Sequence, residues 1–160
     1  MSYSRSTLGL AWSAILVLAV SSSCRREPAT PAFTPGLGEI MTLTQMRHAK
    51  LWLAGQAGNW PLASYELDEL REGLDDAATF HPTHKDASLP IPGLIDKIMK
   101  DPLSELDKAV GARDASAFTP AFDALTEACN SCHRATKFGF NIVARPIGNP
   151  YVNQTFESPR

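Results

Sequence analysis

Cysteine is scarce in this chain, with three residues among 160. Only two of them stand close together, so no second cysteine pair is present to complete a four-cysteine zinc site. An excess of charge of one sign is also missing, because the formal net charge at pH 7 is −2. The chain therefore has neither the basic field that attracts nucleic acid nor a basic patch for an anionic membrane.

An apolar run long enough for a transmembrane helix is missing near the N-terminus as well. The run at residues 8–20 ("LGLAWSAILVLAV") is too short, because a membrane-spanning helix needs about 20 apolar residues. The run follows Arg5 and precedes the small residues "SSSC", which is the pattern of an export signal. We therefore expect residues 1–24 to direct export to the periplasm or another extracytoplasmic space.

Cys24 closes this segment at the position where a bacterial lipoprotein signal carries its lipid-modified cysteine, and the small residues before it resemble a lipobox. Residues 25–36 ("RREPATPAFTPG") are rich in proline, a composition typical of an extended tether. Lipid modification of Cys24 and plain signal cleavage both stay open. A membrane is expected as a partner only through such a lipid anchor.

No convincing strand pattern and no internal repeat follow Gly36. Four segments of helical composition are present instead, separated by short breaks. They are residues 37–57, residues 61–80, residues 93–112 and a segment that ends near residue 135. The last segment has two plausible starts, at Asp114 or at Thr119, and Pro102 is expected to kink or split the third. The pattern predicts an all-α fold, an antiparallel four-helix bundle over residues 37–140, with an irregular tail at residues 141–160.

Both remaining cysteines lie in "CNSCH", where Cys129, Cys132 and His133 form C-x-x-C-H, the haem-attachment signature of c-type cytochromes. Thiols three residues apart occupy neighbouring positions of a helix, so both can bond one edge of a haem. The adjacent imidazole then projects over the porphyrin face and can bind the iron. The sequence therefore predicts one covalently bound haem c.

Other uses of the cysteine pair fit less well. A zinc site needs four protein ligands, so His81 and His84 would have to fold onto the helix; otherwise they belong to a solvated loop. A thioredoxin-like dithiol needs C-x-x-C at a helix start after a strand, whereas this motif lies near a helix end. A disulfide at this spacing would be strained on a helix.

A haem motif near the C-terminal end of the last helix of a four-helix bundle resembles the class II cytochromes c, the cytochrome c-prime group and its low-spin relatives. The resemblance covers about residues 37–140 and rests on the motif and its position. It implies that Cys129 and Cys132 form thioethers and that His133 is the proximal iron ligand. It also implies that the first helix supplies the opposite face of the iron, and it leaves a homodimer open.

The distal ligand is open at this stage. In an antiparallel bundle the level of His133 corresponds to about residues 40–45 of the first helix. Met41 lies inside this window and Met46 lies just past it, while His48 is farther away. Either methionine is equally well explained as core filler.

Two arginines and three apolar residues are further candidate contacts of the haem. Arg47 and Arg145 are candidate partners of the propionates, because guanidinium groups pair well with carboxylates. Phe138, Phe140 and Ile142 are expected to cover the haem edge.

Two functions follow from the two possible states of the iron. With Met41 or Met46 as the sixth ligand, the protein would be an exported carrier of single electrons whose partners are redox proteins. With an open distal face it would bind small gases such as NO or CO. No distal acid–base pair is recognisable, so we do not expect an enzyme.

Overall fold

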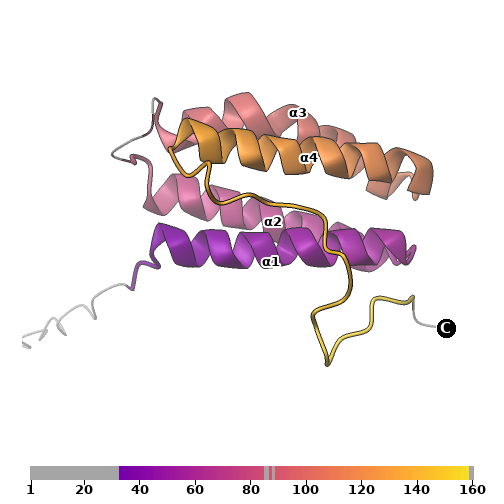
Figure 1. Ribbon diagram of the computed structural model, residues 1–160. Coiled ribbons are helices and arrows are strands. Elements are labelled where there is room, and N and C mark those ends of the chain that lie inside the picture. Colours follow the sequence, from indigo (N-terminus) through magenta and orange to yellow (C-terminus); the bar gives the residue numbers. More distant parts are fainter. Residues whose placement is uncertain (1–32, 85–86, 88, 159–160) are drawn as a thin grey trace, which may run out of the picture. The chain divides into compact units, whose positions relative to one another are not determined.

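The computed structural model describes residues 33–84, 87 and 89–158 (Figure 1). The expected export signal, Cys24 and most of the expected tether lie outside the described residues. Four helices form the described part, which contains no strand. They are α1 (Leu37–Gln56), α2 (Trp60–Phe80), α3 (Ile91–Gly111) and α4 (Ala115–Ala135).

Side-chain caps fix where two of the helices begin. Asn59 caps α2 by accepting a hydrogen bond from the Leu62 amide at 3.3 Å, and Pro61 follows in the first turn, where its missing N–H is not needed. The Asp114 carboxylate accepts from the amides of Ser116 and Ala117 at 2.8 and 3.1 Å. Asp114 is therefore the start of α4, and the alternative start at Thr119 is wrong.

The third helix differs from its prediction in one respect. α3 continues through Pro102 as a single helix, so the expected split does not occur. Met99 and Leu106, on either side of the proline, are both buried in the core. Tertiary packing of this face keeps the helix together although Pro102 provides no backbone donor.

The four helices run alternately in opposite directions, as Figure 1 shows. α1 packs closely on α2, α3 packs on α4, and α2 contacts α3, whereas the backbones of α1 and α4 approach each other much less. The predicted antiparallel four-helix bundle is confirmed. Its centre is made of fully buried side chains, each worth about 1.5–3 kcal/mol of transfer free energy. The largest apolar ones are Leu51, Leu67, Leu70, Met99, Leu106, Phe118, Phe122 and Leu125.

The C-terminal tail runs back along the bundle from the end of α4, across the side where α1 and α4 are apart (Figure 1). It has no helix or strand in its described part, yet it is anchored to the helices. The Tyr151 hydroxyl donates to the Met46 backbone carbonyl at 3.3 Å, and the side-chain amide of Asn59 donates to the Glu157 backbone carbonyl at 3.2 Å. Phe156 is buried within the main core. The tail is thus part of the packed domain.

Gly55 of α1 allows the fully buried ring of Phe118 from α4 to pack against the helix. A Cβ atom at residue 55 would lie 2.1 Å from that ring. We expect Gly55→Ala to lower the free energy of unfolding by about 1–3 kcal/mol, because the ring has no free space to move into.

The matched control is Gly93→Ala, because nothing lies within 4 Å of a Cβ atom at that helical position and alanine is the better helix former. Urea denaturation of both variants measures the difference. Equal free energies of unfolding would contradict the packing described here.

Candidate functional site

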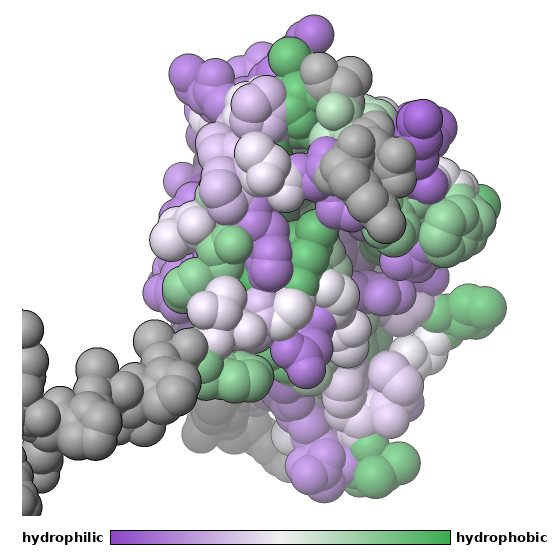
Figure 2. All heavy atoms as spheres, turned by 90° about the vertical axis from the view of Figure 1, so that its left-hand side faces the viewer, coloured by the Kyte–Doolittle hydropathy of each residue, from purple (hydrophilic) through white to green (hydrophobic). Residues whose placement is uncertain are grey.

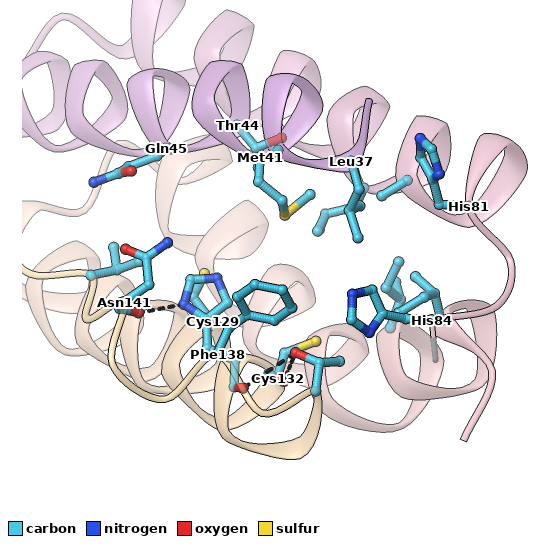
Figure 3. A pocket seen from close by; sticks show the side chains of 18 of the residues that line it. Leu37, Met41, Thr44, Gln45, His81, His84, Cys129, Cys132, Phe138 and Asn141 are labelled. Carbon is cyan, nitrogen blue, oxygen red and sulfur yellow. Dashed lines mark hydrogen bonds between the residues drawn. The ribbon is translucent and has the colours of Figure 1, made fainter. Parts of the chain in front are cut away.

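A cavity of about 420 Å³ opens at the end of the bundle where α1 and α3 begin and α2 and α4 end (Figure 3). All four helices contribute to its wall, together with the α2–α3 loop and the start of the tail. Figure 2 faces this end of the bundle, where apolar side chains lie recessed between polar ones. The volume lies in the range of about 300–1,000 Å³ that is usual for small-molecule sites.

The three side chains of the C-x-x-C-H motif meet at this cavity. Cys129, Cys132 and His133 line it from the last two turns of α4. The two cysteines are not joined by a disulfide. Burial raises the pKa of Cys129 to about 12, with a smaller effect of Cys132, and burial also raises the pKa of Cys132. Such thiols stay protonated at neutral pH, which does not suit a thioredoxin-like dithiol that reacts as a thiolate.

His133 is oriented by the tail. Its Nδ1 atom lies 2.6 Å from the Asn141 carbonyl oxygen (Figure 3). A carbonyl oxygen only accepts, so Nδ1 carries the proton and donates it, and the lone pair is on Nε2. Histidines that bind a metal are commonly fixed in this way, by a hydrogen bond from the second ring nitrogen. His133 therefore has Nε2 available for an iron.

Helix α1 provides the opposite wall. Met41 lines the cavity together with Leu37 and Gln45, and the Met41 side chain points into it in Figure 3. Met46 does not line the cavity, and its backbone carbonyl receives the hydrogen bond from Tyr151. Of the two candidate methionines, the structure brings only Met41 to the same cavity as the motif.

His48 lies at the inner end of the same wall and is only 2% exposed. Its Nε2 atom is 2.9 Å from the Thr126 hydroxyl, which itself donates to the Phe122 carbonyl at 2.9 Å. His48 must therefore donate from Nε2, and its ring lies tilted against the Phe122 ring with 4.4 Å between the ring centres. His48 is thus a packed side chain, and burial lowers its pKa so that the ring is neutral at pH 7.

Because His48 is buried and neutral, the free energy of unfolding is expected to depend on pH. Burial lowers its pKa from 6.5 to about 4, so below pH 6.5 the unfolded chain takes up a proton that the folded chain does not. This contribution to the free energy of unfolding is fully present above pH 6.5. It is lost as the pH falls towards 4, at up to about 1.4 kcal/mol per pH unit.

We expect His48→Gln to remove this dependence, because glutamine keeps an N–H donor for Thr126 but does not titrate. Urea unfolding at pH 7, 6 and 5 measures the slope in each protein. Identical slopes in the wild type and the variant would show that His48 does not cause the loss.

Both arginines that were considered for the propionates lie elsewhere. Arg47 pairs with Glu66 at 3.4 Å and with Glu69 at 2.7 Å. Arg145 pairs with Asp123, and its guanidinium lies 4.6 Å from the centre of a Trp52 ring. Neither arginine lines the cavity, so the structure does not support this role for them.

The three apolar residues that were expected to cover the haem edge differ in whether they line the cavity. Phe138 lines the cavity. Phe140 and Ile142 do not, and they are 80% and 72% exposed. The chain bends after Phe138, where the Asn141 amide donates back to the Phe138 carbonyl at 2.8 Å. Asn141 and Val143 line the cavity, whereas the side chains of Phe140 and Ile142 face away from it.

Both histidines that were expected in a solvated loop, His81 and His84, line the cavity. The His84 ring lies edge-on to Phe138 at 5.1 Å. Its Nδ1 atom is buried and has no hydrogen-bond partner among the described residues. A buried polar atom without a partner is costly, which makes His84 Nδ1 a candidate contact for a polar group of a ligand. The neighbouring His81 instead contacts the Pro35 carbonyl from Nε2 at 2.8 Å.

Comparison with known proteins does not assign the chain to a family. No family model matches the chain, and no curated protein or solved structure matches it.

Among residues 33–84, 87 and 89–158, no helix combines the length and the apolar character needed to cross a membrane. Within the same ranges, no three His, Cys, Asp or Glu side chains are grouped closely enough to hold a metal ion. A haem iron needs only one or two protein ligands, because the porphyrin supplies four.

Proposed function

We propose that the protein is an exported c-type cytochrome that carries single electrons on one haem c. The observation that supports this most is the meeting of Cys129, Cys132 and His133 on one wall of a mostly apolar cavity, with His133 oriented by the Asn141 carbonyl. The bound haem supplies a one-electron iron centre. The bundle and the position of the motif at the end of α4 favour a relative of the class II cytochromes c.

The residues of the cavity would have distinct roles. Cys129 and Cys132 would form the two thioether bonds, and His133 would bind the iron through Nε2. Met41 would bind from α1 on the opposite face, where a thioether favours the reduced state of the iron. The apolar side chains around them exclude water and disfavour charge at the metal.

His84 provides a polar contact for the same group. Its buried Nδ1 atom has no partner in the described chain, and a haem carries two carboxylates. A hydrogen bond between His84 Nδ1 and one propionate would satisfy this atom.

The proposal is tested by the absorption spectrum of protein made with its own leader in a host that matures c-type cytochromes. We expect a haem c spectrum with one haem per chain, low-spin iron, and no change when CO is added to the reduced protein. Colourless protein with both thiols free to alkylate would contradict the proposal. A high-spin spectrum that changes with CO would instead support the gas-binding function.

A further inference from the structure

We propose that Asn130, one of the two variable residues inside the motif, is a positioning residue for the iron ligand. It holds the tail so that the Asn141 carbonyl accepts the proton on His133 Nδ1. The inference rests on the proposed function, because it concerns how the protein controls the histidine that binds the iron. Nothing in the C-x-x-C-H pattern itself requires an asparagine at this position.

Asn130 binds one tail residue through two hydrogen bonds. Its side-chain nitrogen donates to the Val143 carbonyl at 2.9 Å, and its side-chain oxygen accepts from the Val143 amide at 2.8 Å. The side-chain amide thus takes both backbone groups of a single residue, as a neighbouring strand would. The Val143 side chain is buried, with 8% exposed, which adds an apolar anchor at the same point.

The spacing on the two segments places both contacts side by side. Asn130 and His133 are three residues apart on α4, so they are neighbours on one face of the helix. Asn141 and Val143 are two residues apart in a segment without helix or strand. The pair of contacts, Asn130 to Val143 and His133 to Asn141, therefore fixes one short stretch of tail against one face of α4.

Asn141 has no comparable anchor of its own. Asn141 is exposed, and its backbone amide donates to the Phe138 carbonyl at 2.8 Å. Without the contact at Val143, water would compete with the carbonyl for the His133 Nδ1 proton. The Asn130 contact is thus the link between the tail and the ring orientation of His133.

A hydrogen bond from Nδ1 to a carbonyl makes the imidazole a stronger electron donor through Nε2. Stronger donation favours the ferric over the ferrous iron, and so lowers the reduction potential. Loss of the Asn130 contact should raise the potential without removing the haem.

The experiment compares the Asn130→Ala and Asn149→Ala holoproteins with the wild type. Asn149 is the matched control, since it also bridges two backbone groups of the tail, accepting from the Tyr151 amide at 2.8 Å and donating to the Gln154 carbonyl at 2.9 Å. We expect Asn130→Ala to raise the midpoint potential in a redox titration and Asn149→Ala to leave it unchanged. Equal potentials in all three proteins would overturn the inference.

A second measurement on the wild type does not depend on folding of any variant. We expect the His133 Nδ1 proton, observed by NMR in the ferrous holoprotein, to exchange with solvent more slowly than that of a free imidazole. Exchange at the free rate would overturn the inference, and the haem would still be present. A wild-type protein without haem would contradict the proposed function itself, so the two failures are distinguishable.

Discussion

The Cys132→Ala chain is expected to lose haem-linked staining on a denaturing gel, whereas the wild-type chain stains fully. Denaturation removes the cavity and breaks the iron–ligand bonds, so only sulfur–carbon bonds keep a haem on the chain. Cys129 and Cys132 line the same cavity from α4, and we expect covalent attachment to fail when one of the two thioethers cannot form. The experiment requires a host that matures c-type cytochromes and a stain for the peroxidase activity of haem.

Ser131→Ala is the matched control for this prediction. Ser131 lies between the two cysteines and its hydroxyl accepts from the Arg134 side chain at 2.8 Å, so the change disturbs the same turn without removing sulfur. We expect full staining of this variant. Full staining of Cys132→Ala would contradict the assignment of the motif, and loss of staining in Ser131→Ala would attribute the effect to a disturbed helix.

The second large effect is expected for Met41→Ala, which should convert low-spin iron to high-spin iron and allow the reduced protein to bind CO. Met41 contributes the sulfur atom that α1 points into the cavity. The cavity is also lined by His48, which donates from Nε2 to Thr126, and by Met99, which is buried in the core. We expect neither side chain to replace the lost thioether. Ferric and ferrous absorption spectra with and without CO measure both changes.

Met46→Ala is the matched control, because Met46 is also partly buried on α1 but does not line the cavity. We expect its spectra to equal those of the wild type. Low-spin spectra in both variants would rule out Met41 as the ligand. High-spin, CO-binding iron already in the wild type would rule out methionine ligation and support the gas-binding alternative.

Much of the fold was predictable because it depends on interactions between residues close in sequence. Apolar residues at helical spacing indicated four helices, and the observed bounds differ from the predicted ones by only one or two residues at most ends. Two features near prolines were less clear. The start of α4 was decided by the Asp114 cap, and α3 passes through Pro102 because its buried face is held by the core.

The sequence by itself determined the four-helix class and the candidate motif, because two cysteines and a histidine within five residues have a fixed relation on any helix. Only the tertiary structure decided which side chains face that motif. The contacts concerned join residues far apart in the chain: His48 and Thr126 are 78 residues apart, and Tyr151 and Met46 are 105 apart. The register of α1 against α4 and the path of the tail depend on such packing, which brings Met41, His84 and Asn141 to the cavity and leaves Met46 outside.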